Sequence, residues 1–308
     1  MNICILGAGA LGCAIGSALA RAGSDVSLVN RSPAHVAAIN RHGLRVREGE
    51  TERTVPLRAS TDCANLGPAD LVIVLVKSFD TQAAIAAASP LIGDATVVMS
   101  LQNGLGHERV LAGAVGAHRV IAGRTYVGGV MLGPGHVIAG TRAKRTFIGE
   151  LDGRASERTR AIAAEFDRAG LATTVADDIV GVIWDKLLVN VATGALAGIT
   201  RLPYGPLYAV PEIESTALQA VAEAMAVASA LGVRVSVREP RDAWTMAGAG
   251  LSDDFKTSML QSLEKGSRTE IDFINGAVVR EGERLGIPTP VNRTLVACIK
   301  GIEKGLGT

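Results

Sequence analysis

A glycine-rich turn near the start of the chain has residue types suited to holding the phosphates of a dinucleotide. The turn fits the pattern G-x-G-x-x-G and consists of Gly7, Ala8, Gly9, Ala10, Leu11 and Gly12. It follows an apolar run, 2–6, and opens a segment with helical spacing, which is the context that this pattern requires. The first glycine permits a tight turn, the second lets the backbone approach a pyrophosphate, and the third lets the helix pack on a sheet. Free N–H groups at the helix N-terminus would bind the phosphates, whereas the alternative is a glycine turn without a ligand.

The end of the second apolar run decides which nicotinamide cofactor is expected. A carboxylate there would accept hydrogen bonds from ribose hydroxyls and repel a 2′-phosphate. The chain instead has Asn30 and Arg31 after Val29, and a guanidinium can make a bidentate contact with a phosphate. The sequence therefore favours NADPH (NADP) over NADH, and the alternative for Arg31 is an ordinary surface arginine.

Polar residues also follow the third and fourth apolar runs. Lys77 comes after the run 71–76, and Asn103 comes after the run 96–101. Ligands of open α/β sheets bind at the carboxyl ends of the strands, so either side chain could hydrogen-bond the nicotinamide ribose, its carboxamide or the substrate. Either could equally be a turn residue, since Asn-Gly is a common turn pair.

A lysine and an asparagine lie four residues apart in an apolar helical segment. Lys186 and Asn190 therefore share one helix face. Partial desolvation among Trp, Leu and Val side chains would make the Lys186 ammonium a better proton donor to a carbonyl oxygen. The alternative is a lysine that extends to the surface and pairs with Asp185.

Two more polar residues lie in the last quarter of the chain. Ser258 opens the run Ser-Met-Leu-Gln, and Glu270 lies among apolar residues at helical spacing. Glu270 could be a carboxylate at a helix N-terminus, stabilised by the dipole, or a hydrogen-bonding group in an active site. The spacing leaves both interpretations open.

The elements that must position these residues alternate between strand and helix in the first half. Apolar runs predict strands at 2–6, 25–29, 71–76, 96–101 and 120–122. Helical spacing lies between them, at 11–22, 34–41 and 81–88 and from 107 onward. This order predicts an α/β fold with a Rossmann-type, doubly wound parallel sheet. The segment 44–57 predicts a hairpin or loop excursion, and the segment 137–150 predicts antiparallel strands at an edge.

The second half repeats apolar residues at helical spacing. Helices are predicted at 178–197, 212–231, 241–246, 254–265 and 270–285. We therefore predict an NADP-binding Rossmann domain at 1–176 and an all-helical substrate and catalytic domain at 177–308. The apolar, alanine-rich helices could form a homodimer face as easily as a core.

The composition excludes several classes of protein. The chain has 308 residues, of which 48% are hydrophobic and 20% charged, which is enough apolar material for two cores and too much for a disordered chain. Lys plus Arg number 31 against 30 Asp plus Glu, so the formal net charge is +1. That balance lacks the basic excess of a protein that binds nucleic acid or an anionic membrane. We expect a small-molecule partner.

Cysteines, histidines and apolar stretches exclude further features. The four cysteines form no C-x-x-C pair, which predicts reduced thiols in a cytoplasmic protein. The five histidines show no H-E-x-x-H or triad spacing, so we expect no metal site and assign them no role. Glycines interrupt the uncharged segment 1–20, and no later stretch has about 18 unbroken apolar residues, so no membrane partner is expected.

Taken in order along the whole chain, these motifs resemble the ketopantoate reductase (2-dehydropantoate 2-reductase) family. The specific ones are Asn103-Gly104, Lys186-x-x-x-Asn190, Ser258-Met259-Leu260-Gln261 and Thr269-Glu270-Ile271-Asp272. The resemblance implies NADPH-dependent reduction of a 2-oxo acid to a 2-hydroxy acid, in a cleft between a Rossmann domain and a helical domain. It implies that Lys186 is the general acid and that Glu270 binds the substrate hydroxyl or assists proton transfer. By the same resemblance, Asn103, Asn190 and Ser258 hold the substrate, the serine near its carboxylate.

The chain departs from the family pattern at four positions. Family members commonly have Asn and Pro where this chain has Gly194 and Ala195, a small polar residue in place of Tyr204, and Asp in place of Ser262. Losing the asparagine removes a hydrogen bond to the 4-hydroxyl of ketopantoate, and one such contact can decide orders of magnitude in discrimination. The cofactor and the reaction class survive these changes, but the assignment of the substrate does not, so we expect either ketopantoate or another branched 2-oxo acid.

Two rival functions are considered. A β-hydroxyacid dehydrogenase also pairs a Rossmann domain with a helical Lys-x-x-x-Asn motif, but it has no comparable Thr-Glu-Ile-Asp segment, so Glu270 argues against it. A non-catalytic NADPH-binding regulator would keep the fold without the chemistry, and the presence of Lys186, Asn190 and Glu270 argues against that function.

Overall fold

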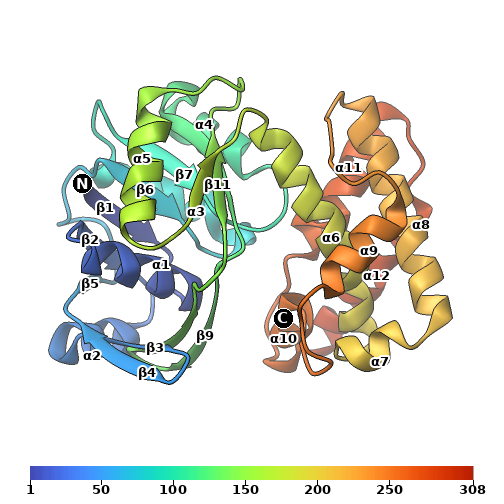
Figure 1. Cartoon of the computed structure of the whole chain (residues 1–308), viewed down its shortest axis with the longest axis horizontal. Helices are drawn as coiled ribbons and strands as arrows, with labels where there is room; N and C mark the ends of the chain where they lie inside the picture. The colour runs from blue at the N-terminus through green and yellow to red at the C-terminus, as the bar shows by residue number, and fades with distance from the viewer. Residues whose placement is uncertain (308) are drawn as a thin grey trace. The chain divides into compact units, whose positions relative to one another are not determined.

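The structure, a computed structural model, describes residues 1–307 of the chain. It divides into two compact units, drawn in Figure 1. The first contains Met1–Gln102 and His107–Ile179, and the second contains the short loop Asn103–Gly106 and the chain from Val180 onward. Each unit has its own buried apolar core, as expected for independent domains.

The first unit is built on an eight-stranded sheet of order β12-β11-β8-β7-β6-β1-β2-β5. The strands are β1 Asn2–Leu6, β2 Asp25–Val29, β5 Arg58–Ser60, β6 Leu71–Val74, β7 Val97–Ser100, β8 Val120–Thr125, β11 Thr146–Gly149 and β12 Thr173–Val175. Neighbouring strands are parallel except β11 and β8, which are antiparallel. The predicted doubly wound sheet is confirmed. From β1 the chain adds strands in one direction, to β2 and β5, and from β6 onward it adds them in the other direction. Open α/β sheets bind ligands at the switch point, where this strand order reverses.

Helices cover both faces of this sheet (Figure 1). They are α1 Ala10–Arg21, α2 Pro33–His42, α3 Thr81–Ala87, α4 His107–Val115 and α5 Glu157–Arg168, with the 3-10 helices η1 Ser78–Asp80, η2 Ser89–Leu91 and η3 Ala117–Arg119. Because successive side chains of a strand point to opposite faces, Ile3 and Ile5 pack in the core with α1, and Cys4 and Leu6 pack in the other core. Burial on both faces explains the unbroken apolar runs in the sequence.

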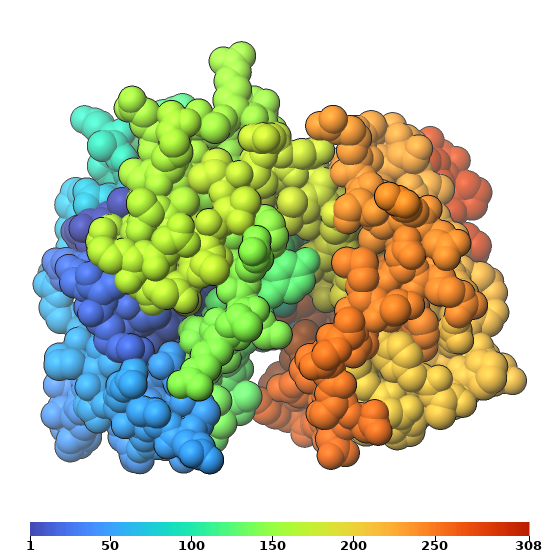
Figure 2. Space-filling model, viewed as in Figure 1, coloured from blue at the N-terminus to red at the C-terminus, as the bar shows by residue number. Residues whose placement is uncertain are grey.

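A second sheet of the first unit has the order β4-β3-β10-β9. Its strands are β3 Leu44–Glu48, β4 Thr51–Val55, β9 Gly128–Gly133 and β10 His136–Gly140. The predicted hairpin is confirmed in β3 and β4, and Figure 2 shows green residues of this region beside the blue residues of the hairpin. The expectation of antiparallel strands at 137–150 is right for both β10, which is antiparallel to β9, and β11, which is antiparallel to β8. The expected edge position is wrong for both, because each has a second neighbour, β3 for β10 and β12 for β11, with which it pairs in parallel. The alternation of side chains along a strand does not reveal which sheet the strand joins. Its backbone N–H and C=O groups can form hydrogen bonds with a partner in either sheet.

The second unit is helical. Its elements are α6 Ile179–Thr200, α7 Tyr204–Tyr208, α8 Pro211–Ala230, α9 Pro240–Gly248, α10 Ser258–Glu264, η4 Ile271–Phe273, α11 Asn275–Leu285 and α12 Pro290–Gly305. By length and hydropathy α6 could cross a membrane, with a mean hydropathy of 1.5 over its best 18 residues, but 67% of that window is buried inside the protein. Its apolar side chains therefore form the core of the helical unit.

Two predicted helices are shorter than the apolar spacing suggests. The segment 254–265 becomes helical only at Ser258, because Thr257 is the N-cap and its hydroxyl accepts a hydrogen bond from a first-turn amide. The segment 270–285 is broken at Ile274, whose φ of −107° and ψ of −97° separate η4 from α11. The sequence patterns also do not predict α5, α7 or α12.

An ion pair joins the end of β11 to α5 and generates a prediction about stability. Two hydrogen bonds of 2.7 and 2.6 Å from Arg158 to Glu150 hold the pKa of Glu150 below its usual range. A lowered carboxyl pKa stabilises the folded state above the unfolded-state pKa, and that contribution is lost as the pH falls through the folded-state value. We expect Glu150→Gln to lower the free energy of unfolding by about 1–2 kcal/mol near pH 7 and by much less at about pH 3, measured by urea denaturation.

Asp152→Asn is the matched control. Asp152 pairs with the Arg154 side chain at 3.6 Å and accepts a hydrogen bond from the Arg154 amide at 3.0 Å, but both side chains are mostly exposed, so we expect a much smaller loss of stability than in Glu150→Gln. A loss in Glu150→Gln that is equal at both pH values would contradict the ion-pair explanation.

Candidate cofactor and catalytic site

The glycine turn after β1 admits only glycine at two positions. Gly7 has a φ of 107°, and a Cβ on it would lie 2.3 Å from the backbone nitrogen of Val76. A Cβ on Gly12 would lie 2.5 Å from the carbonyl oxygen of Gly7. The amides of Gly7 and Ala8 both donate to the carbonyl oxygen of Val29, at 3.1 and 2.8 Å. The turn is therefore packed against the carboxyl ends of β2 and β6, at the switch point of the sheet.

Gly9 differs from these glycines because the space beside it is open. Its φ of −74° is allowed for any residue, and no heavy atom lies within 4 Å of the position of a Cβ. Gly9 is the N-cap of α1, which has no side-chain cap and no acidic residue in its first turn. The first-turn amides of α1 can therefore bind an anion, which the helix dipole also favours. These residues fit the pyrophosphate of a dinucleotide.

The predicted cofactor residues Arg31 and Lys77 lie on neighbouring loops. The guanidinium of Arg31, after β2, pairs with Asp80 at 2.7 Å, and the Arg31 side chain is 83% exposed. Asp80 ends η1, which directly follows Lys77, and Lys77 is also exposed. The ion pair thus joins the loop after β2 to the loop after β6 and leaves both cationic side chains accessible to a phosphate.

Gln102 supports two loops of the candidate site, and the sequence reasoning did not single it out. Its buried Nε2 donates to the carbonyl oxygen of Val76 and to the hydroxyl of Thr81, both at 2.8 Å. Its Oε1 accepts from the hydroxyl of Ser100 at 3.0 Å. Gln102 therefore ties the loop after β6 to the loop after β7. The available signal is a polar side chain directly after an apolar strand, which led us to Lys77 and Asn103 but not to Gln102.

The loop Asn103–Gly106 belongs to the second unit. The amide of Leu105 donates to the carbonyl oxygen of Phe273 at 2.9 Å. Gly104 has a φ of 92°, and a Cβ on it would lie 2.4 Å from the same oxygen. Phe273 ends η4, which begins directly after Glu270. The structure therefore brings the Asn103 loop to the segment that carries Glu270.

Lys186 and Asn190 lie one turn apart on α6, and both are partly exposed. The residues around them on the helix, including Trp184 and Leu187, are buried in the core, so the polar pair occupies the accessible side. The carboxylate of Asp185 accepts from the amides of Ser236 at 2.7 Å and Val237 at 3.4 Å. Asp185 thus has a structural role of its own, in holding the loop before α9.

Glu270 is held in place by α12. The preceding residue, Thr269, is buried and donates its amide and its hydroxyl to Glu303 at 2.6 and 2.7 Å. Glu270 itself is partly exposed and precedes the short helix η4. It therefore does not lie in the first turn of the long α-helix predicted at 270–285, and the helix-dipole interpretation loses its basis.

A second anchor of this segment is Asp272. Its carboxylate accepts from Lys300 of α12 at 2.9 Å and from Arg268 at 3.2 Å. Burial alone would raise the pKa of Asp272, but these two cations outweigh it and the pKa lies below its usual range. The peptide around Glu270 is thus fixed on both sides.

Ser258 and Ser262 lie on α10. Ser258 is the first residue of the helix and is exposed, as a substrate-binding hydroxyl must be. The hydroxyl of Ser262, where the family pattern has an aspartate, donates to the carbonyl oxygen of Ser258 at 3.0 Å. The hydroxyl of Ser262 therefore has its hydrogen-bond acceptor within its own helix.

The departures at Gly194 and Tyr204 change the inside of the helical unit. Gly194 is buried on α6, two turns after Lys186, and a Cβ on it would meet only the methyl carbon of Met259, at 3.7 Å. Tyr204 is buried, its hydroxyl lies 3.1 Å from that of Thr193, and its ring packs on Phe255 at a centroid distance of 4.9 Å. A methyl group would therefore fit at Gly194, and the aromatic pair Tyr204 and Phe255 lies in the same unit.

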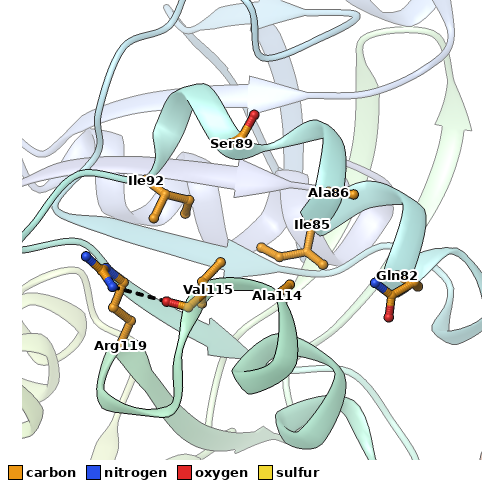
Figure 3. A pocket seen from close by; sticks show the side chains of 8 residues that line it. All are labelled: Gln82, Ile85, Ala86, Ser89, Ile92, Ala114, Val115 and Arg119. Carbon is orange, nitrogen blue, oxygen red and sulfur yellow. Dashed lines mark hydrogen bonds between the residues drawn. The ribbon is translucent and has the colours of Figure 1, made fainter.

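The first unit also carries an open groove of about 500 Å³ on its surface (Figure 3). Its lining residues come from α3, η2, α4 and η3, and they are Gln82, Ile85, Ala86, Ser89, Ile92, Ala114, Val115 and Arg119. Arg119 donates to the carbonyl oxygens of Val115 at 3.1 Å and Gly93 at 3.2 Å. None of the predicted site residues lines the groove, and we assign it no part in the chemistry.

A doubly wound sheet has a glycine turn at its switch point, and a helical unit follows it in the chain. This combination is typical of nicotinamide-dependent oxidoreductases of the Rossmann type. The chain belongs to the ketopantoate reductase PanE/ApbA family. The family's first model matches residues 3–153, and the model of its C-terminal part matches residues 178–303. The resemblance drawn from the motifs is therefore confirmed, together with the enzyme class.

Individual relatives agree with this membership. The chain is 35% identical to a 2-dehydropantoate 2-reductase of Archaeoglobus fulgidus over 303 residues, covering 98% of each chain. The solved structure of a PanE/ApbA family ketopantoate reductase from Ralstonia eutropha JMP134 is 37% identical, with a TM-score of 0.92 and 100% of both chains covered. A D-mandelate dehydrogenase solved with NADH and anilino(oxo)acetate is 26% identical, with a TM-score of 0.94 and the same coverage.

The open space at Gly9 gives a test of the cofactor site. We expect Gly9→Ala to leave the melting temperature unchanged, because its methyl group meets nothing in the protein. We expect the same methyl group to weaken NADPH binding about tenfold or more, because a pyrophosphate must approach the backbone there. The measurements are thermal unfolding and fluorescence titration with NADPH.

Gly23→Ala serves as the control for a remote glycine. Gly23 also has open space around its Cβ position, but its φ of 95° makes an alanine strained, so this variant should lose stability and keep its NADPH affinity. Unchanged NADPH affinity in Gly9→Ala would contradict the placement of the phosphates.

Proposed function

We propose that this chain catalyses the NADPH-dependent reduction of a 2-oxo acid, ketopantoate or a related branched 2-oxo acid, to the 2-hydroxy acid. The observation that carries the proposal is the match to ketopantoate reductases over both parts of the chain. The β-hydroxyacid dehydrogenase alternative is not favoured, because the curated relatives that match along the full length are 2-dehydropantoate 2-reductases.

The first unit supplies the cofactor-binding residues in this proposal. The turn Gly7–Gly12 holds the pyrophosphate on the first-turn amides of α1, and Arg31 with Lys77 binds the 2′-phosphate and the ribose. Asp80, paired with Arg31 at 2.7 Å, orients the guanidinium. NADPH supplies a hydride from C4 of its nicotinamide when bound.

The helical unit supplies the acid and the substrate contacts. Lys186 donates a proton to the carbonyl oxygen of the substrate as negative charge develops there, which lowers the barrier both by proton transfer and by charge stabilisation. Asn190, one turn further on the same face of α6, orients the substrate. Glu270 accepts a hydrogen bond from the new hydroxyl, and its support by α12 limits its movement.

The substrate carboxylate is assigned to Ser258. Ser258 is exposed at the start of α10, where its hydroxyl can donate a hydrogen bond to a carboxylate. Asn103, on the loop that packs on Phe273, donates to the substrate or to the nicotinamide. These assignments give each polar group of a 2-oxo acid a partner.

A second candidate substrate class is the aryl 2-oxo acids. Gly194 leaves space where the family pattern has an asparagine, and the aromatic side chains of Tyr204 and Phe255 lie in the same unit. A D-mandelate dehydrogenase with this fold was solved with anilino(oxo)acetate. Both observations favour a substrate with a large apolar group.

The role of Lys186 is tested by Lys186→Ala. We expect turnover to fall by a factor of about a thousand or more, since both the acid and its charge are lost, while NADPH still binds in a fluorescence titration. Lys304→Ala, which removes an exposed lysine of α12, should leave turnover unchanged. Turnover of Lys186→Ala at the normal rate would refute the assignment, and absence of NADPH oxidation by the unmodified protein with any 2-oxo acid would favour the non-catalytic regulator.

The two substrate classes are separated by Gly194→Asn. We expect this change to raise the ratio of kcat/KM for ketopantoate to that for phenylglyoxylate by about tenfold or more, because it adds a hydrogen-bonding amide and fills space. Gly194→Ala is the matched control, since a methyl group fits at 3.7 Å from Met259 and adds no hydrogen bond. An unchanged ratio in Gly194→Asn would show that this position does not contact the substrate.

A further inference from the structure

One carbonyl group of the glycine turn, that of Ala8, is held by several side chains. Ala8 is fully buried. Its oxygen accepts from Nδ2 of Asn30 at 2.7 Å and from the thiol of Cys13 at 3.4 Å. Because a peptide group is planar, the position of this oxygen also sets the direction of the Gly9 amide, which donates to Gly7 at 2.8 Å. The peptide between Ala8 and Gly9 is therefore held at both ends.

His35 joins this cluster from the first turn of α2. Its side chain is buried, with 3% of its surface exposed. The backbone amide of Gly135, in the turn between β9 and β10, donates to Nδ1 at 3.0 Å. Since that amide can only donate, Nδ1 carries no proton and the neutral imidazole carries its proton on Nε2. Nε2 faces the backbone of Ala8 and the Cys13 sulfur, the latter at 3.4 Å.

We propose that His35, together with Asn30, is a positioning residue that holds the glycine turn in the conformation needed to bind the phosphates of the dinucleotide. The inference rests on the proposed function, because it takes the turn to be the cofactor site. The imidazole connects three segments that are far apart in the sequence: the glycine turn, α2 and the β9–β10 turn. Without it, the Ala8 peptide loses a lateral support, and the amides of α1 lose part of their preorganisation for an anion.

The support requires a neutral imidazole. Burial lowers the pKa of His35, an effect that a hydrogen bond to the backbone of Ala8 only partly opposes. Protonation would place a second donor at Nδ1, facing the amide of Gly135, and that hydrogen bond would be lost. NADPH affinity is therefore expected to be full near neutral pH and to fall as the medium is acidified below the usual range of histidine.

Three ionisable groups on the elements around His35 have partners or a charge state of their own, so we assign the expected pH dependence to His35. From α1, burial raises the pKa of the Cys13 thiol to about 12, so it stays neutral. His136 in the β9–β10 region pairs with Glu52 at 3.0 Å. In the loop before α2, Arg31 pairs with Asp80.

The test compares His35→Leu with His35→Gln by fluorescence titration with NADPH. The leucine removes both hydrogen bonds, and we expect the Kd to rise about tenfold near pH 7.5, with kcat at saturating NADPH changed less than about twofold. The glutamine amide can both donate and accept, and we expect a Kd within about threefold of the unmodified protein. Between about pH 7.5 and pH 5, the Kd should rise for the unmodified protein and stay nearly constant for His35→Gln, a comparison that stands even if the leucine variant fails to fold.

Asn40→Ala is the matched control on the same helix. Asn40 makes two hydrogen bonds of 2.9 Å to the backbone of Ala59 and none to the glycine turn, so its loss should lower the melting temperature without changing the Kd. The inference is overturned if His35→Leu binds NADPH normally, if Asn40→Ala weakens binding as much, or if His35→Gln keeps the pH dependence. Failure of the unmodified protein to bind NADPH would instead overturn the proposed function.

Discussion

The close packing of the glycine turn against the carboxyl ends of β2 and β6 is the constraint on which the first unit depends. A single added carbon at Gly7 would lie 2.3 Å from the backbone of the loop after β6. No side chain fits at such a distance. The glycine turn can therefore contact the loops after β2 and β6 only because Gly7 has no side chain. This contact places the N-terminus of α1 at the switch point of the sheet, where a phosphate can be bound by backbone groups alone.

Support for this turn comes from parts of the chain that carry no recognisable motif. The second sheet reaches the start of α1, because a Cβ on Gly129 of β9 would lie 2.8 Å from the carbonyl oxygen of Ala10. Its β9–β10 turn also holds His35. Strands β9 and β10 and the turn between them therefore contact both α1 and His35 of α2.

In the helical unit too, a candidate site residue is held by a segment that is distant in the sequence. The Glu270 segment is fixed by Glu303 and Lys300, both on α12, and the loop that carries Asn103 is fixed by Phe273. Such support would help Glu270 in the role proposed for it, because preorganisation reduces the entropy lost on binding. The position of Glu270 thus depends on residues about 30 positions later in the chain.

The sequence by itself determined the strand and helix order of the first unit, the glycine turn and the candidate residues from Arg31 to Glu270, because these features depend on periodicity, on steric limits at glycine and on residue chemistry. The tertiary structure alone decided the helix break at Ile274, the parallel pairing of β10 with β3 and the hydrogen-bond partners of Gln102 and His35. Each of these depends on hydrogen bonds between segments far apart in the chain. Local patterns contain no information about which distant backbone group a buried side chain will meet.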